Sequence, residues 1–359
     1  MATYDMPASE FATSIGGSAL SQDTINAILA LTTTLPGTTG VSIAVFDPNV
    51  TVAAGTTVIQ FGDGQVLTGD PGTPVIIMSP NAGGGTAVIN ADTPRTIVGS
   101  ASAEVLTFQG NAGVTMETGG GNDLINTGSG NNNIVISGAG SPTIVTGTGD
   151  DIITLGGTGN RQVDLGDGNN TVILNTNSGT STIVAGSGVD TLQVSGPISS
   201  HTLTLGANLT LLLNSSPTQL KGVDLIEFGS GVTVVSENRT KTDMARLYEV
   251  MFDRMGDKGG LKAWLNTVEA GASIFDVAKA FAGSPEFQNK FASMDNTAYL
   301  QALYQNMSGR GADQAGLQYW LGQMSNGMSR ADVAVAFAGS AEAIQLMGIN
   351  GTKYVIDLV

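Results

Sequence analysis

Glycine-rich turns in the middle of the chain end in oxygen-bearing side chains that could bind a cation. Four of these turns keep two glycines and end in Asn or Asp: GSGNN (128–132), GTGDD (147–151), GDGNN (166–170) and GSGVD (186–190). Carboxylate and amide oxygens, together with turn carbonyls, are the ligands that Ca²⁺ takes in proteins. These turns are therefore candidates for binding a divalent cation.

A second set of turns alternates with the first and is less regular. Its members are GGGND (119–123), GAGSP (138–142), GTGNR (157–161) and NSGTS (177–181). Only the first of them ends in a carboxylate, that of Asp123, so we expect calcium chiefly on the regular edge. The alternative for the regular edge is a metal-free ladder, in which stacked side-chain amides hydrogen-bond from one repeat to the next.

The apolar residues between the turns indicate the elements that must position these side chains. They recur in steps of 9 to 11 residues, so that two steps give a period of 19 to 20: Ile125, Ile134, Ile144, Ile153, Val163, Val172, Ile183 and Leu192. Two short strands and two turns per period predict a parallel β-solenoid, a β-roll or β-helix, whose coils stack about 4.8 Å apart. We expect it to span 45–236, with the clearest coils at 118–194, and to place residues one period apart in columns.

Over 118–194 this repeat resembles the repeats-in-toxin (RTX) nonapeptide Gly-Gly-x-Gly-x-Asp-x-U-x, whose turns bind calcium. Asp123, Asp151 and Asp190 occupy the aspartate position of that pattern, and Asn132 and Asn170 replace it with neutral oxygen ligands. The first glycine of the pattern is replaced in several turns, by Thr127, Thr146, Leu165 or Ala185. The resemblance implies a calcium-stabilised solenoid of the kind found in bacterial proteins exported by type I secretion. The candidate calcium ligands that it implies are Asp123, Asn132, Asp150, Asp151, Asn170 and Asp190.

The two ends of the chain differ from this middle part. Residues 1–44 contain SQDTINAILALTTTL (21–35), whose apolar spacing predicts a short amphipathic helix. We expect this segment to cap the first coil, since a solenoid needs a terminal cap, with an assembly or anchoring role as the alternative.

Helical periodicity replaces the β pattern over 243–345, where a repeat recurs with an offset of 56 residues: LYEVMFDRMGDKGGLKAWL (247–265) matches LYQNMSGRGADQAGLQYWL (303–321). The pattern predicts an all-α repeat domain with helix N-caps at Asp257, Asp313, Ser284 and Ser340. Trp264 and Trp320 are expected in its core, and Arg254–Asp257 and Arg310–Asp313 as ion pairs. This region resembles an uncharacterised helical family marked by Leu-Tyr…Arg-x-x-Asp-x-x-Gly-Leu-x-x-Trp, which accompanies RTX arrays in secreted bacterial proteins.

The tail NGTKYVIDLV (350–359), within the segment 346–359, is similar to the uncleaved C-terminal signals of type I secretion substrates. The N-terminal MATYDMPASEF has neither the basic nor the apolar stretch of a signal peptide. The sequence also contains no apolar run long enough for a transmembrane segment. We therefore expect a protein secreted by a bacterium to its surface or surroundings, with type I secretion machinery as a partner.

Composition and charge argue against several function classes. A net charge of −16 disfavours binding to nucleic acid, which needs a basic surface. The sequence has no cysteine and one histidine, His201. A His-Glu-x-x-His metal site needs two histidines, and a catalytic triad would have His201 as its sole candidate base. We therefore expect no enzyme activity.

These observations predict a multidomain protein, β followed by α, with a structural function. We expect a secreted cell-surface protein that forms a homo-oligomer or polymer, as an S-layer-like lattice or an extracellular filament of a biofilm matrix, stabilised by calcium. One alternative is an adhesin or matrix-binding module that binds a cell-surface glycan or lipopolysaccharide. The other is a polysaccharide-modifying enzyme or its accessory module.

Overall fold

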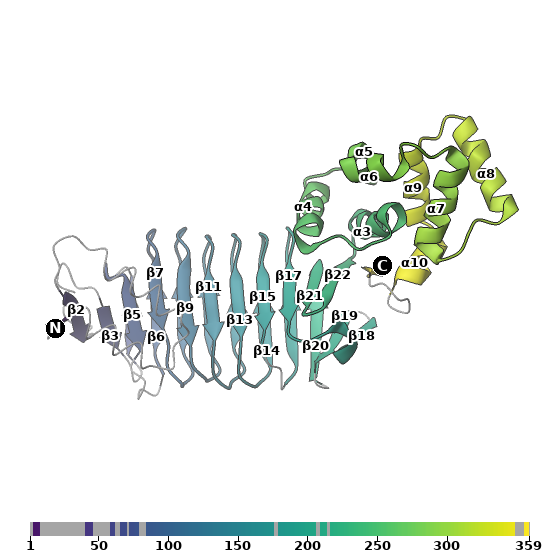
Figure 1. The fold of residues 1–359 in the computed structure, drawn as a ribbon. Coiled ribbons are helices and arrows are strands. Elements are labelled where there is room, and N and C mark those ends of the chain that lie inside the picture. Colours follow the sequence, from purple (N-terminus) through teal and green to yellow (C-terminus); the bar gives the residue numbers. More distant parts are fainter. Residues whose placement is uncertain are drawn as a thin grey trace. The chain divides into compact units, whose positions relative to one another are not determined.

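The computed structural model describes residues 3–7, 40–45, 58–61, 65–69, 72–78, 84–175, 179–205, 209–213, 216–348 and 355–358, the first three ranges by their backbone alone. The chain forms two compact units (Figure 1). The solenoid unit is Met1–Thr202 with Thr210–Lys221, and the helical unit is Leu203–Leu209 with Gly222–Val359. The helix predicted within 21–35 lies outside the described residues.

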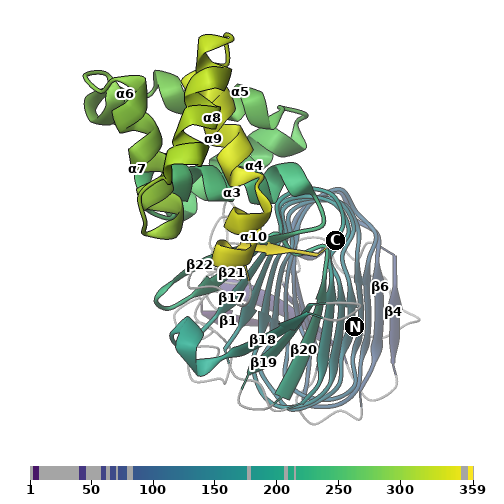
Figure 2. The same ribbon diagram turned by 90° about the vertical axis from the view of Figure 1, so that its right-hand side faces the viewer.

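The solenoid unit consists of two facing sheets (Figure 2). The first contains, in spatial order, β1 (Thr3–Pro7), β2 (Gly40–Val45), β3 (Val58–Phe61), β5 (Val75–Met78), β7 (Arg95–Val98), β9 (Val114–Thr118), β11 (Asn133–Ile136), β13 (Ile152–Leu155), β15 (Thr171–Leu174) and β17 (Thr191–Val194). The second contains β4 (Val66–Thr68), β6 (Thr86–Ile89), β8 (Val105–Phe108), β10 (Leu124–Thr127), β12 (Thr143–Val145), β14 (Arg161–Asp164), β16 (Ser181–Val184) and β20 (Ser216–Lys221). Between β17 and β20 the chain forms the 3₁₀-helix η1 (Ile198–Ser200), β18 (Thr202–Leu205) and β19 (Leu209–Leu213).

The predicted parallel solenoid with a 19-residue coil is confirmed over residues 66–194. Each strand pairs in parallel with the strand one coil away, as Leu124 does with Val105 and Thr143. Successive side chains of a strand point to opposite faces, so alternate residues of each strand enter the space between the sheets. The apolar residues that set the sequence period are all buried there.

In its described residues, the helical unit contains eight helices, with two strands before them and one strand after them. Among these strands, β21 (Leu225–Phe228) pairs antiparallel with β22 (Gly231–Ser236), and β22 pairs parallel with β23 (Val355–Asp357). Part of the segment expected to be a secretion signal is therefore a strand of this unit. The helices are α3 (Arg239–Phe252), α4 (Lys258–Glu269), α5 (Ile274–Gly283), α6 (Pro285–Phe291), α7 (Asn296–Ser308), α8 (Gln314–Ser325), α9 (Arg330–Ala338) and α10 (Ala341–Met347).

The two sequence repeats form equivalent helices, with α3–α6 matched by α7–α10. Asp257 and Asp313 accept hydrogen bonds from the N–H groups of Gly260 and Gly316 at the starts of α4 and α8. Ser284 caps α6 in the same way, as Ser340 caps α10, so the four predicted N-caps are confirmed. Trp264 and Trp320 are half-buried and pack on Phe281 and Phe337, with ring centroids 5.2 Å apart in both pairs.

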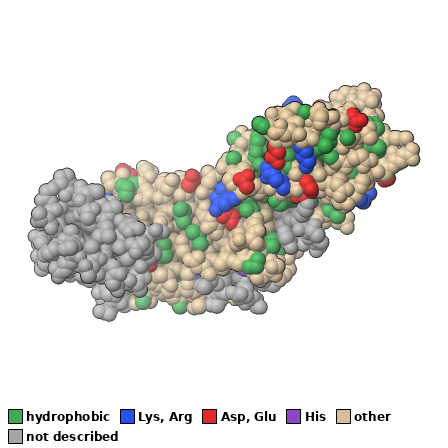
Figure 3. Space-filling model, in the orientation of Figure 1, with side chains coloured by type: hydrophobic (Ala, Val, Ile, Leu, Met, Phe, Trp, Pro, Cys, Tyr) green, Lys and Arg blue, Asp and Glu red, His purple; other side chains and the backbone are tan. Residues whose placement is uncertain are grey.

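The predicted ion pairs within the repeat are wrong. Arg254 forms its salt bridge with Glu286 at 2.8 Å, and Arg310 forms its own with Glu342 at 2.5 Å. The physical reason is that Asp257 and Asp313 use their carboxylates to cap α4 and α8, which leaves each arginine to pair with an acidic residue in the first turn of α6 or α10. Figure 3 shows basic and acidic side chains next to one another on the visible face of the helical unit.

Replacement of Asp257 by alanine should lower the free energy of unfolding of the helical unit by about 1 kcal/mol, the usual value of an N-cap. Asp313→Ala should do the same, because the cap is equivalent in the second repeat. Chemical denaturation followed by far-UV circular dichroism measures both losses. The conservative variant Asp257→Asn keeps an N-cap oxygen and should stay close to wild type.

Candidate cation-binding edge of the solenoid

Four of the six predicted ligands form one buried column. The register of the first sheet stacks Asn132, Asp151, Asn170 and Asp190 at the residue preceding β11, β13, β15 and β17. Backbone N–H groups donate along the column to the side-chain Oδ1 of the next coil: Asn132 to Asp151 at 2.8 Å, Asp151 to Asn170 at 3.0 Å and Asn170 to Asp190 at 3.1 Å. The predicted column of residues one period apart is therefore confirmed.

Amides and carboxylates alternate in this column, and the alternation adds further hydrogen bonds. Nδ2 of Asn132 donates to Oδ1 of Asp151 at 2.8 Å, and Nδ2 of Asn170 donates to Oδ1 of Asp190 at 2.9 Å. Each of these two carboxylates thus accepts a backbone and a side-chain hydrogen bond from the preceding asparagine. These bonds join adjacent coils without requiring an ion.

Asp150 belongs to a second, exposed column on the same edge. Its Oδ1 accepts from the N–H of Asn169 at 2.7 Å, and its own N–H donates to Oδ1 of Asn131 at 2.9 Å. In this outer column each side chain accepts from the following coil, whereas in the buried column each accepts from the preceding coil. Of two adjacent residues in a turn, the outer side chain therefore accepts a hydrogen bond from the following coil, and the inner side chain accepts one from the preceding coil.

Asp151 has one carboxylate oxygen that the ladder does not use. Its Oδ2 is buried and has no hydrogen-bond partner of normal geometry in the part of the chain that the structure describes. The nearby Thr146 hydroxyl donates to the carbonyl of Leu165 at 2.7 Å instead. Burial raises the pKa of the Asp151 carboxyl, although hydrogen bonds from Asn132 act in the opposite sense. Oδ2 of Asp151 is thus an oxygen that a cation could bind without breaking a ladder bond.

Asp123 lies on the opposite edge, as expected from its turn. The register of the second sheet stacks it with Glu104, Pro142, Arg161 and Ser181. Its Oδ1 accepts the N–H of Glu104 at 3.0 Å. Sequence reasoning missed Glu104, because no glycine turn precedes it, although its position 19 residues before Asp123 could have indicated it.

Other sites in the described residues offer little chemistry. They contain no group of three or more His, Asp or Glu side chains arranged to hold a metal ion. His201 contacts the carbonyl of Ser195 through Nε2 at 2.9 Å. No helix among these residues is long and apolar enough to span a membrane.

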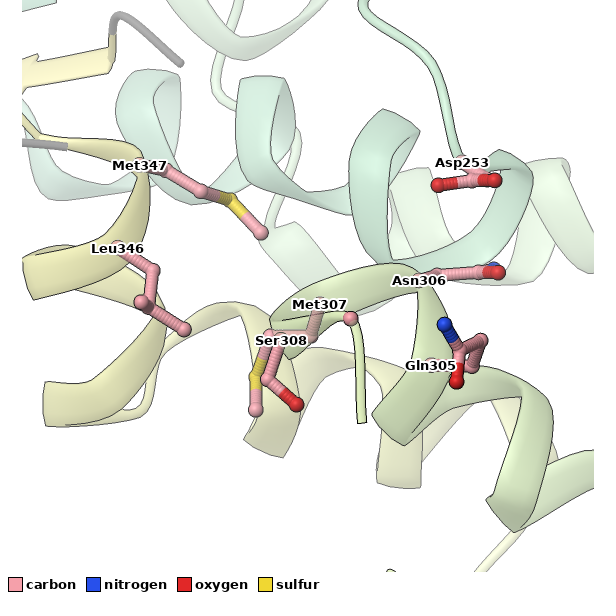
Figure 4. Close-up of a pocket in the computed structure, with 8 residues that line it drawn as sticks. Asp253, Gln305, Asn306, Met307, Ser308, Leu346 and Met347 are labelled. Carbon is pink, nitrogen blue, oxygen red and sulfur yellow. The ribbon is translucent and has the colours of Figure 1, made fainter. Parts of the chain in front are cut away.

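A pocket of about 320 Å³ opens in the helical unit where α3 and α7 end (Figure 4). Asp253, Gln305 and Ser308 contribute its polar side chains, and Met347 and Leu346 its apolar ones. Asn306 uses Nδ2 to hold the carbonyl of Val250 at 2.9 Å. This lining contains no nucleophile paired with a base.

The helical unit matches a family model described as "Domain of unknown function (DUF4214)", at residues 236–291 and again at 278–347. The two matches overlap and together cover the helices α3–α10, the region in which the sequence predicted an uncharacterised helical family. No curated protein and no solved structure matches the chain.

Proposed function

We propose that this chain is a secreted structural protein of a bacterial surface, which assembles with further copies into an S-layer-like lattice or a filament and is stabilised by calcium. A solenoid of stacked coils supports this function, because its columns repeat along the unit and present the same chemistry at each step. Its RTX-like turns and the similarity of the segment 346–359 to type I signals support export.

The observation that carries assembly is a charge-free row on the outer face of the second sheet. The register aligns Val66, Thr86, Val105, Leu124 and Thr143 across five strands. Val66, Val105 and Leu124 are 53%, 37% and 47% exposed, among the most exposed large apolar side chains described. A charge-free row of valine, leucine and threonine side chains favours contact with another sheet face, and we infer that a second copy supplies it.

Replacement of Leu124 by lysine should weaken association without unfolding the solenoid, because the side chain is exposed and a charge in the contact would lose its water. Sedimentation velocity over a range of protein concentrations measures the change. The matched control is Ile152→Lys, since Ile152 is 45% exposed on the other sheet. Equal association of wild type and Leu124→Lys would contradict the proposed face.

The observation that supports calcium is the buried, unused Oδ2 of Asp151 on the regular edge. Extracellular calcium modules bind at about 10⁻⁴–10⁻³ M, well above cytosolic calcium levels. An ion of this affinity would order the coils only after export, since metal binding contributes directly to folding. Asp151 would hold the ion, and the amide members of the column would remain engaged in the ladder.

The variant Asp151→Asn separates the ion from the ladder. It keeps Oδ1 as an acceptor but removes the negative charge, so the thermal unfolding temperature should no longer rise as much with calcium as it does in wild type. Asp151→Ala also removes the acceptor for two Asn132 donors, and should cost about 1–3 kcal/mol for each group left unpaired, with or without calcium. An identical calcium response in wild type and Asp151→Asn would contradict the role of Asp151.

A second candidate function is adhesion to a glycan, favoured by the surface of α8. This helix carries no charged residue, and Tyr319 is 59% exposed beside Trp320, with ring centroids 5.0 Å apart. Aromatic faces combined with amide side chains are suited to neutral sugars. Binding of the full chain to a glycan array, lost in Tyr319→Ala, would support this function, and an array without signal would exclude the glycans tested.

A further inference from the structure

Near Asp123, the solenoid has a buried polar residue at a position that is apolar in the following coils. Thr118 is buried and is in register with Ile136 of the next coil. The same column continues with Leu155 and Leu174, and these three residues after Thr118 are buried and apolar. One coil earlier the chain has Gly99, where an added Cβ would lie 3.0 Å from Oε2 of Glu104 and 3.1 Å from Cγ2 of Thr118. The missing side chain leaves room for the carboxylate of Glu104.

Glu104 and Asp123 meet in this space from adjacent coils. Each is 2% exposed. Oε1 of Glu104 accepts hydrogen bonds from the N–H of Ser100 at 2.9 Å and from the Ser100 hydroxyl, while the N–H of Glu104 donates to Oδ1 of Asp123. Three buried oxygens have no hydrogen-bond partner of normal geometry among the described residues: Oε2 of Glu104, Oδ2 of Asp123 and Oγ1 of Thr118.

No positive side chain balances the two acids in the described part of the chain. No cation is among the groups that shift the pKa values of Glu104 and Asp123. Arg161, two coils beyond Asp123 in the same column, donates to the carbonyls of Gly156 and Gly157. Burial raises the pKa of Glu104 to about 7, and the charge of Asp123 adds to the shift. Burial also raises the pKa of Asp123, against the hydrogen bond from Glu104 and the nearby Thr118 hydroxyl. Two buried carboxylates without a counter-charge are strongly unfavourable.

We propose that Glu104, Asp123 and Thr118 bind a cation inside the solenoid, at a site separate from the regular edge. The site offers only oxygen ligands, two of them carboxylates, which suits a hard cation such as Ca²⁺. A divalent ion neutralises both carboxylates and gives the three unpartnered oxygens a common partner. The site requires Glu104, which the glycine repeat does not contain, and it does not depend on self-assembly or on Asp151.

The test titrates calcium chloride into the metal-free chain of residues 1–359. Isothermal calorimetry gives the number of ions bound, and calorimetric thermal unfolding gives the stability. The variant is Glu104→Gln, which keeps the shape of the side chain, and the control is Asp151→Asn on the other edge. Glu104→Gln should bind fewer ions than wild type and show a smaller calcium-dependent rise in unfolding temperature. In chelator it should unfold at a higher temperature than wild type, because a buried negative charge is gone.

Equal ion counts and equal calcium responses in wild type and Glu104→Gln would overturn the proposal. A shared proton in place of the ion would also overturn it, and would have its own signature. Without calcium, the stability of wild type would then fall as pH rises from the ordinary glutamate value of 4.5 through about 7. At a pH of about 7.5, calcium would raise the unfolding temperatures of wild type and Glu104→Gln by the same amount. Loss of an ion in Asp151→Asn but not in Glu104→Gln would assign calcium to the regular edge alone.

Discussion

Replacement of Asp357 by alanine should destabilise the helical unit by about 2–3 kcal/mol, since the buried guanidinium of Arg246 loses one of its two carboxylate partners. Arg246 on α3 is 0% exposed. Its Nη1 donates to Oδ2 of Asp357 at 2.9 Å and its Nη2 donates to Oδ1 at 3.1 Å. Without Asp357 the guanidinium keeps Asp243, at 2.7 Å, and the carbonyl of Ala338. Denaturant unfolding followed by far-UV circular dichroism measures the loss.

The matched control is Glu286→Ala, which removes one partner of the exposed pair Arg254–Glu286. Their side chains are 42% and 45% exposed, so the loss should stay below about 1 kcal/mol. Equal effects of the two substitutions would contradict the structural role of β23. They would also show that residues 355–358 do not dock as described.

The same ion pair predicts a loss of stability in acid. Burial alone would raise the pKa of Asp357, but hydrogen bonds from Arg246 and Thr242 outweigh it and hold the pKa below its ordinary value of 3.8. The stabilising contribution is therefore present above that pH and is lost as pH falls through the lower pKa of the folded protein. Asp357→Ala should show less acid sensitivity in the helical unit than wild type.

The second large effect is expected from Gly168→Ala, in a turn of the regular edge. Gly168 has φ +123°, and an added Cβ would lie 2.1 Å from the carbonyl oxygen of Gly149 in the preceding coil. The overlap is with backbone of a stacked coil, so relief requires the coils to separate. Backbone strain and overpacking together should cost about 3 kcal/mol or more.

The control for this variant is Gly69→Ala, which shares the positive φ, +85°, but has no atom within 4 Å of the added Cβ. Its cost should be limited to the backbone term, about 1–2 kcal/mol. Calorimetric unfolding of the full chain compares the two. If Gly168→Ala were no worse than Gly69→Ala, the coils would not be stacked as closely as the hydrogen bonds between them indicate.

The spacing of the chain was enough to predict the coils, the columns and the helical repeats. Glycine turns at a fixed period leave few ways to bury Ile125 and Ile144 other than stacking, and the predicted column from Asn132 to Asp190 follows from the same period. N-caps at Asp257 and Asp313 were predictable because capping depends on a local sequence. The RTX identity of the turns and their calcium remain predictions.

Side-chain pairing over long sequence distances could not be predicted in this way. The partner of Arg254 is Glu286, on another helix, because Asp257 is occupied by its cap. Glu104 and Asp123 come together only through the register of adjacent coils. Asp150 accepts its hydrogen bond from the following coil and Asp151 from the preceding coil, and this difference depends on which of the two side chains points inward. The sequence pattern of the turns 128–132, 147–151 and 166–170 does not distinguish them, because both positions carry Asn, Asp and Asn in that order.

Calcium-dependent assembly is tested most directly by electron microscopy of the purified chain, in calcium and in a calcium chelator. It predicts ordered sheets or filaments with calcium and dispersed particles in chelator. Dispersed single particles with calcium at every protein concentration tried, or identical assemblies in both conditions, would contradict it.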